Sequence, residues 1–315
     1  MKGVKIGIIG VGHAGAHVMY SIALQGLADE ILIVDTDEKK AKSEHRDLFD
    51  TVSLLPHRVR IRIAEAKDLG ECDVIVNAAG EVAKFNIEDD ISKELEQTLP
   101  AVRSWLGDVK ASGFDGVVIN ISDPCDVITR EIAKELGLPK GRVFGTGTGI
   151  DTARLASILA EKTGIDHKSI ICFMLGEHGD DQFVPWSYIS FRGKPLSILE
   201  QVDPVFAFDK NEVQQEVKNS LRVLHEGKGF TEYAIAMVAT SLISSVLHDE
   251  KSIMPVSAEL DGEYGESGVF VGVPAIIGAG GVEDLLQLPL NAEEQEKFHN
   301  CCESIRENFK IADSM

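Results

Sequence analysis

Short apolar runs alternate with longer segments that place apolar residues every three or four positions through the first 145 residues. The short runs predict buried strands and the longer segments predict helices that cover them. Strands are expected over residues 5–10, 30–35, 58–64, 72–78, 116–121 and 142–145, and helices over 13–25, 38–52, 87–111 and 124–136. Pro100 predicts a kink or break in the third helix. Strands that alternate with helices indicate an α/β fold with a parallel sheet covered on both faces.

The pattern changes after Gly147. Helices are expected over 151–162, 212–224, 231–247 and 292–309, and strands over 169–175, 186–192 and 269–277. Long helices with fewer, less regular strands indicate an α+β arrangement. We therefore expect two domains, an N-terminal one over 1–147 and a C-terminal, substrate-binding α+β one over 148–315.

Composition narrows the class of protein. The chain has 315 residues, of which 44% are hydrophobic and 26% charged, as is usual for a soluble protein with a sizeable core. The net charge of −20 argues against nucleic acid and anionic membranes as partners. No apolar run reaches the roughly 18 to 20 residues of a membrane helix. The five cysteines lack metal-ligand spacing, so we expect a cytoplasmic protein without a metal site.

A glycine-rich loop follows the first predicted strand and opens the first predicted helix. Gly10, Gly12 and Gly15 have the G-x-G-x-x-G spacing that lets a pyrophosphate approach a helix N-terminus. Asp35 ends the second strand, where a carboxylate accepts from a ribose 2′-hydroxyl and repels a 2′-phosphate. The alternative is a purely structural turn, but this context favours a doubly wound Rossmann sheet that binds NAD rather than NADP. Ala79 and Gly80 end the fourth strand and are expected at the same cofactor edge.

The segment Gly176-Glu177-His178-Gly179-Asp180 places one imidazole in a loop at the end of a predicted strand. Upstream, Asp151 and Arg154 begin a predicted helix. Taken singly, these are a surface histidine, a helix N-cap and a surface charge. Taken together they could move a proton on a substrate oxygen and bind a carboxylate with a guanidinium.

Several motifs in a fixed order carry a resemblance. They are the glycine loop, Ser112-Gly113-Phe114-Asp115-Gly116, Gly145-Thr146-Gly147-Thr148, Asp151-Thr152-Ala153-Arg154, Gly176-Glu177-His178-Gly179 and Pro274-Ala275-Ile276-Ile277-Gly278. Over almost its full length the chain resembles the L-lactate/L-malate dehydrogenase family, and within it most the L-2-hydroxyisocaproate dehydrogenase branch. The resemblance implies a homodimer or homotetramer that transfers hydride between NADH and a small 2-oxo acid.

The same resemblance implies a role for each catalytic residue. His178 would be the acid/base, Asp151 would hold its tautomer and favour the imidazolium, and Arg154 would bind the substrate carboxylate through two hydrogen bonds. A carboxylate beside His178 should raise the pKa of the ring because it stabilises the charged form.

Two positions depart from the family pattern. Where the family has a carbonyl-polarising arginine in a mobile loop, alignment places Ile91, and Asp123 stands where the family has an asparagine. Both changes make the site more negative, which disfavours the transition state of an anionic oxo acid. Lys84 could replace the arginine, the substrate could carry a cationic or imino group, ordinary 2-oxo acids could turn over poorly, or the alignment could be shifted.

The leading hypothesis is an NAD-dependent L-2-hydroxy acid dehydrogenase, an oxidoreductase acting on CH–OH groups. The apolar loop residues Val82, Phe85 and Ile87 favour a substrate bulkier than lactate. The alternatives are a reductase for a cationic or imino substrate and a non-catalytic NAD-binding protein of the same fold.

Overall fold

A computed structural model of the protein describes residues 3–80, 91–179 and 181–315. Six parallel strands form the N-terminal part of its main sheet, in the spatial order β3-β2-β1-β4-β5-β6. This is the doubly wound order of dinucleotide-binding folds. The strands are β1 (Lys5–Ile9), β2 (Glu30–Val34), β3 (Arg60–Ile63), β4 (Val74–Asn77), β5 (Val117–Asn120) and β6 (Val143–Gly145). The helices between them are α1 (His13–Gln25), α2 (Glu38–Thr51), α3 (Ile91–Ala111) and α4 (Cys125–Leu136).

The C-terminal half extends this same sheet. Three antiparallel strands, β10 (Ser252–Asp261), β11 (Ser267–Gly278) and β12 (Gly281–Leu285), continue it beyond β6. The pairing of Gly145 with Ser257 joins β6 to β10. A second, small sheet contains β7 (Ile170–Ile171), β8 (Ser190–Phe191) and β9 (Lys194–Pro195).

The helices of this half are α5 (Gly149–Thr163), α6 (Leu196–Leu199), α7 (Lys210–Lys228), α8 (Tyr233–His248) and α9 (Ala292–Ser314). Short 3₁₀ turns lie at Val52–Leu54, Ala66–Glu71, His167–Ser169, Pro204–Phe206 and Glu263–Gly265.

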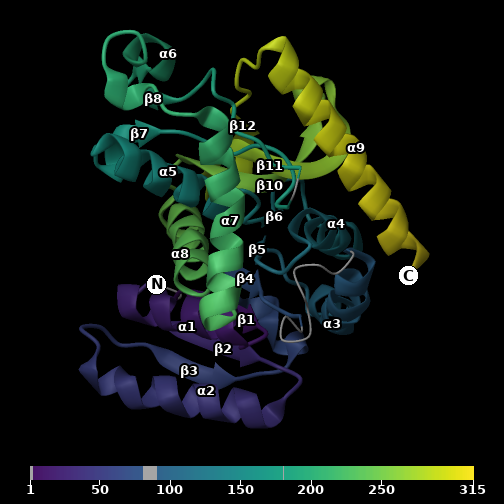
Figure 1. The fold of residues 1–315 in the computed structure, drawn as a ribbon. Coiled ribbons are helices and arrows are strands. Elements are labelled where there is room, and N and C mark those ends of the chain that lie inside the picture. Colours follow the sequence, from purple (N-terminus) through teal and green to yellow (C-terminus); the bar gives the residue numbers. More distant parts are fainter. Residues whose placement is uncertain (1–2, 81–90, 180) are drawn as a thin grey trace.

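Helices cover the sheet on both faces, as expected (Figure 1). α1 packs against α8, whereas α3 packs against α4, and α9 crosses from β11 to these two helices. Residues such as Ile8, Ile33 and Ile75 are fully buried between the layers. Among the described residues, no single helix has the length and apolar composition to cross a membrane; α7 and α8 meet that criterion only when counted together across their sharp bend.

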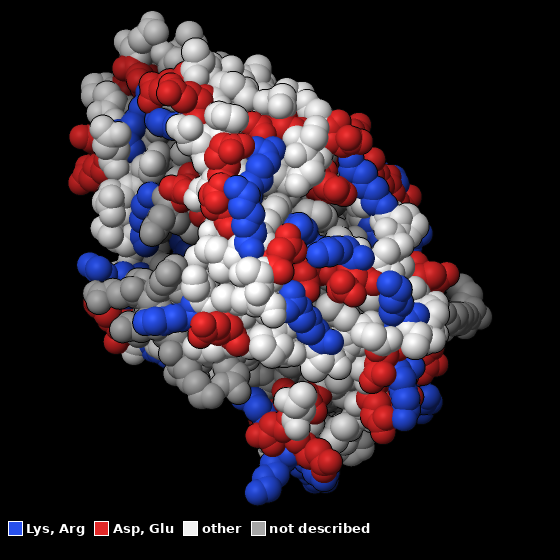
Figure 2. All heavy atoms as spheres, turned by 90° about the vertical axis from the view of Figure 1, so that its right-hand side faces the viewer, with Lys and Arg blue, Asp and Glu red and all other residues white. Residues whose placement is uncertain are grey.

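Acidic and basic side chains are mixed on the surface, although the acidic ones are in excess (Figure 2). Figure 2 shows acidic and basic side chains interleaved over the face that corresponds to the right-hand side of Figure 1. Helix α9 carries short-range ion pairs, such as Lys297 with Glu293 and Lys310 with Glu307. The acidic excess behind the net charge of −20 therefore does not form a purely acidic surface on this face (Figure 2).

Several details differ from the sequence-based expectations, including the short elements β9, α6 and β12, which were not expected. Strand β10 was not expected, because Pro255 and neighbouring polar residues obscure its pattern; Pro255 lies opposite Pro274 in the register with β11. The strands expected over 169–175 and 186–192 are reduced to the two-residue strands β7 and β8. Pro100 lies inside α3, which runs from Ile91 to Ala111, so it does not end the helix.

Candidate active site

The glycine loop connects β1 to α1 and leaves room where a cofactor would approach. Gly10 has a φ of +85°, and a Cβ at Gly15 would lie 2.0 Å from the Gly10 carbonyl oxygen, so both positions exclude side chains. No described atom lies within 4 Å of a Cβ built on Gly12. α1 begins without a described side-chain cap and without an acid in its first turn. Its N–H groups are therefore suited to an anion such as a pyrophosphate.

The other predicted cofactor residues lie beside this loop. Asp35 follows β2 and accepts hydrogen bonds from the main-chain N–H groups of Val11 and Asp37, both at 2.8 Å. Ala79 and Gly80 follow β4, the neighbour of β1 on its other side. The carboxyl ends of three adjacent strands thus bring these residues to one edge of the sheet, as a dinucleotide site requires.

Asp151 joins His178 and Arg154 in one cluster. Its Oδ2 lies 2.6 Å from Nδ1 of His178, and its Oδ1 accepts from Nη1 of Arg154 at 3.0 Å. Asp151 is 1% exposed and lies in the first turn of α5, where Thr148 is the N-cap, so it is not itself the cap. Nε2 of His178 faces away from Asp151, and the ring is partly accessible. The cluster can therefore present a proton and a guanidinium to the same small molecule.

The charges around His178 fix its protonation state. Burial disfavours the charged ring, but the charge and hydrogen bond of Asp151, with the charge of Asp123, raise the pKa of His178 to about 10. Burial also opposes the charge of Asp151, yet His178 and Arg154 lower the pKa of this carboxyl overall. His178 is therefore an imidazolium at neutral pH, which is the form that donates a proton.

Asp123 and a residue missed at the sequence level, Glu94, place two further carboxyl groups in the surroundings of His178. Asp123 Oδ1 lies 3.8 Å from His178 Nε2, and 46% of the Asp123 side chain is accessible. The surrounding protein nevertheless raises the pKa of Asp123 by desolvation. Burial and the charge of Asp123 raise the pKa of Glu94 to about 8. Only the helical position of Glu94, one turn after Ile91, could have suggested that it faces the site.

The position expected for a carbonyl-polarising cation carries no charge. Ile91 begins α3, and its half-buried side chain packs against the hydrophobic core. Lys84, the sequence-based candidate for a replacement, lies outside the described residues, as do Val82, Phe85 and Ile87. In the described part of the chain, the cations bound to Asp151 at this site are thus Arg154 and the protonated His178.

The loop that carries His178 is also held through its main chain. The N–H of His178 donates to Asp126 Oδ2 at 3.2 Å, and the N–H of Glu177 donates to Cys301 Sγ at 2.8 Å. Asn308 donates to the Glu177 carboxylate at 2.9 Å. Burial, followed by the charges of Asp126 and Asp181, raises the pKa of Glu177 to about 7. Sequence reasoning expected none of these contacts, because they join segments more than 50 residues apart.

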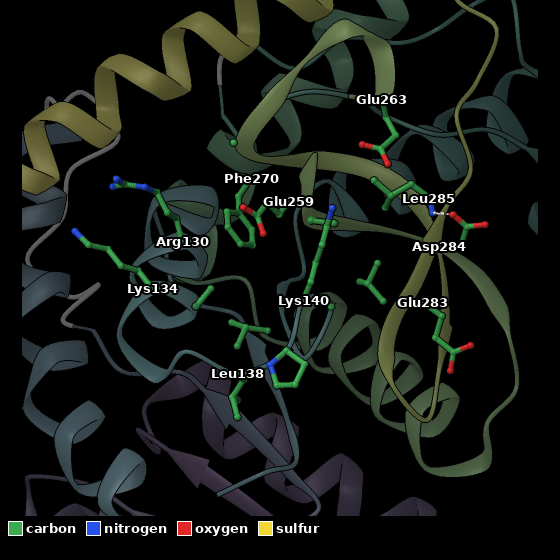
Figure 3. Close-up of a pocket in the computed structure, with 17 residues that line it drawn as sticks. Arg130, Lys134, Leu138, Lys140, Glu259, Glu263, Phe270, Glu283, Asp284 and Leu285 are labelled. Atoms are coloured by element: carbon green, nitrogen blue, oxygen red, sulfur yellow. Dashed lines mark hydrogen bonds between the residues drawn. The ribbon is translucent and has the colours of Figure 1, made fainter. Parts of the chain in front are cut away.

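A separate cavity of about 600 Å³ lies between α4, the turn before β6 and strands β10 to β12 (Figure 3). Lys140, Glu259 and Asp284 are among the residues that line it. Two of its cations, Arg130 and Lys134, already bind Asp313 of α9. None of the predicted site residues that the structure describes lines this cavity, so it is distinct from the cluster around His178.

Comparisons with known proteins cover nearly the whole chain. Residues 4–145 match the family model of the lactate/malate dehydrogenase NAD binding domain, and residues 148–314 match that of the lactate/malate dehydrogenase alpha/beta C-terminal domain. An L-lactate dehydrogenase of Fusobacterium nucleatum is 38% identical over 98% of this chain and 97% of its own length. L-lactate dehydrogenase 3 of Bacillus cereus is 36% identical over 97% of both chains.

Solved structures give the same result. A lactate dehydrogenase from a Medee basin deep-sea metagenome library superimposes with a TM-score of 0.94 at 28% identity, covering 99% of this chain and 100% of its own. The ligand-bound minor L-lactate dehydrogenase of Enterococcus mundtii has a TM-score of 0.90 at 31% identity, covering 99% of this chain and 98% of its own.

Proposed function

Because the chain belongs to the lactate/malate dehydrogenase family, we propose that it reduces a 2-oxo acid to an L-2-hydroxy acid with His178 as proton donor. The observation that carries this proposal is the Asp151 carboxylate shared by His178 and Arg154. A binding protein without chemistry has no need of an imidazolium and a guanidinium held by one buried acid.

Family membership confirms the Rossmann-type fold, NAD as cofactor and an oxidoreductase acting on a 2-hydroxy acid. The division at residues 147 and 148, the cytoplasmic location, the homodimer or homotetramer and the hydroxyisocaproate-type branch remain parts of our proposal. The limits of the two family models support the division.

The chain's own residues would act as follows. Gly10, Gly12 and Gly15 would admit the pyrophosphate, and Asp35 would accept from a ribose hydroxyl. Bound NADH supplies the hydride. Ala79 and Gly80 would line the same edge of the sheet.

At the substrate, Arg154 would hold the carboxylate by two parallel N–H donors, which fixes the position of the neighbouring carbonyl. Nε2 of His178 would give its proton to the carbonyl oxygen, while Asp151 keeps the ring in the correct tautomer. Proton donation of this kind contributes roughly 10²–10⁴-fold to the rate.

We further propose a side chain bulkier than that of lactate, because the alignment places the apolar Ile91 where the family has a charged residue, and because the loop residues Val82, Phe85 and Ile87 are apolar. A panel of 2-oxo acids of increasing side-chain size, followed by NADH absorbance at 340 nm, tests this. We expect kcat/KM to rise from pyruvate to 4-methyl-2-oxopentanoate. The reverse order would contradict the bulky substrate, and no oxidation with any oxo acid would favour a non-catalytic NAD-binding protein.

One observation favours a second candidate, reduction of a cationic 2-imino acid. Asp123, 3.8 Å from Nε2 of His178, could accept from an iminium N–H at the position of the carbonyl oxygen. In that case, methylamine added to a 2-oxo acid should accelerate NADH oxidation and yield an N-methyl amino acid by mass spectrometry. Asp123→Asn should abolish this acceleration and preserve oxo-acid reduction. No acceleration by methylamine at any pH would eliminate the candidate.

A further inference from the structure

We propose that Asp126 is a positioning residue for the reaction: its carboxylate fixes the main chain of His178 while Asp151 fixes the ring. The inference rests on the proposed role of His178 and extends it to a residue that does not touch the substrate.

Asp126 lies in the first turn of α4 and is 2% exposed. Its Oδ2 accepts the main-chain N–H of His178 at 3.2 Å, and its Oδ1 accepts the hydroxyl of Ser257 at 2.5 Å. Ser257 is fully buried on β10, where it pairs with Gly145 of β6. One carboxylate thus ties the His178 loop to α4 and to the centre of the main sheet.

The other anchors of this loop come from the C-terminal half. The N–H of Gly176 donates to Gly272 of β11 at 3.1 Å, and the N–H of Glu177 donates to Cys301 of α9 at 2.8 Å. The N–H groups of Gly176, Glu177 and His178 thus each have a different partner. Of these three partners, Asp126 is the one that lies in the N-terminal half. It therefore sets the distance between His178 and the cofactor edge, which the N-terminal half provides.

Both partners donate to the ionised carboxylate of Asp126; the His178 N–H can only donate, whereas the Ser257 hydroxyl can also accept. A protonated Asp126 could donate to Ser257 Oγ and still accept the His178 N–H, but the hydrogen bond to His178 would lose its charge and weaken. The titratable groups that face Asp126 are Asp123 beside it, His178 and Glu177 in the loop, and Cys301 and Cys302 on α9. Burial, against the hydrogen bonds from Ser257 and His178, raises the pKa of Asp126 to about 6.

Positioning and a merely structural role predict different results for Asp126→Asn. The amide has nearly the same volume and removes a buried charge, so the thermal midpoint should not fall. The amide nitrogen can donate to Ser257 Oγ, and the amide oxygen can still accept the His178 N–H, but without the charge that strengthens this hydrogen bond, so the His178 loop should be held less firmly. We expect kcat to fall about tenfold with little change in the KM of the oxo acid, which Arg154 binds. The decline of wild-type kcat below about pH 6 should disappear in this variant.

Glu131→Gln is the matched control. Glu131 is a buried carboxylate on the same helix, but it binds Arg103 of α3 at 2.6 Å rather than the catalytic loop. We expect this variant to lower the thermal midpoint and to leave kcat and its pH profile unchanged.

The titration of the His178 ring, followed by ¹⁵N NMR in wild type and Asp126→Asn, provides a readout without turnover. A changed ring environment in the variant is the expected result. Unchanged kcat and an unchanged His178 spectrum in Asp126→Asn would overturn the proposal. Absence of turnover in wild type would instead defeat the proposed function and leave the NMR comparison to judge Asp126.

Discussion

At the scale of single residues, the distribution of charge around His178 explains what the site can do. Asp151 serves His178 and Arg154 with its two oxygens, so neither cation competes for the same atom. Asp123 and Glu94 add acid on the side of Nε2, and Ile91 adds no opposing cation. The site therefore holds a proton strongly but offers little positive charge to a developing alkoxide.

Asp151→Asn tests whether Asp151 is what makes His178 hold its proton strongly. Without the carboxylate charge, the pKa of His178 should fall well below about 10, because Asp151 is the main group that raises it. In the reductive direction the alkaline limb of kcat/KM against pH should move to lower pH, and kcat should fall about 10²-fold or more. An alkaline limb that stays in place would show that Asp151 does not set the protonation of His178.

Ile91→Arg tests whether the site lacks positive charge near the carbonyl oxygen of the substrate. A guanidinium at the start of α3 should stabilise negative charge on the carbonyl oxygen and raise kcat/KM for plain 2-oxo acids by about tenfold or more. Ile91→Met, which has similar length without charge, should not have this effect. A gain in both variants would point to packing, and a gain in neither would mean that residue 91 does not reach the substrate.

At the scale of elements, the glycines in the turn from β1 into α1 have different roles, some in folding and one in binding. Gly15 is packed against the Gly10 carbonyl, whereas the space around Gly12 is open. We infer that Gly10 and Gly15 serve the fold and that Gly12 serves the ligand.

Two alanine substitutions distinguish these roles. Gly12→Ala should leave the thermal midpoint nearly unchanged but weaken NADH binding about tenfold, because the methyl group occupies space that the pyrophosphate needs. Gly15→Ala should lower the thermal midpoint markedly, because its Cβ would lie 2.0 Å from a carbonyl oxygen. NADH fluorescence titration and differential scanning fluorimetry measure both. Equal NADH affinity in Gly12→Ala and wild type would remove the loop from the cofactor site.

At the scale of the whole molecule, several buried groups bind protons more tightly in the folded chain than in the unfolded one. Burial raises the pKa values of Asp126, Glu177 and Glu94 to about 6, 7 and 8, and Asp151 raises that of His178 against its burial. Unfolded acids titrate near pH 4 and unfolded histidine near pH 6.5. Between about pH 5 and pH 9 the folded state therefore holds more protons, and its stability falls as pH rises.

The thermal midpoint should accordingly be several degrees lower at pH 9 than at pH 6. A Glu94→Gln/Glu177→Gln double variant should flatten this dependence, since its amides do not titrate. Scanning fluorimetry across this range gives both curves. A midpoint that rises with pH would mean that these carboxyls are ionised without cost in the folded protein.

The fold was more predictable from the sequence than the electrostatics of the site. Buried strands such as β1 and β4 are nearly pure apolar runs, and glycine or acidic residues mark where they end. Asp151, Arg154 and His178, which the structure brings into contact, could be proposed together because their short motifs resemble those of a known family. Glu94, Asp126 and Cys301 could not, because each acts on a segment far along the chain and its role depends on helix orientation. β10 was hidden for a related reason, since its partners on both sides supply the stability that its own sequence lacks.

The hydrogen bonding between β6 and β10 has a consequence for dissecting this protein. Cutting the chain after residue 147 would leave each fragment with an unpaired edge strand, β6 in one and β10 in the other. His178 would also lose its hydrogen bond to Asp126 of α4. The separate fragments should therefore be inactive and prone to aggregate through their unpaired strands. When both are produced in the same cell, β6 and β10 should pair again and restore activity.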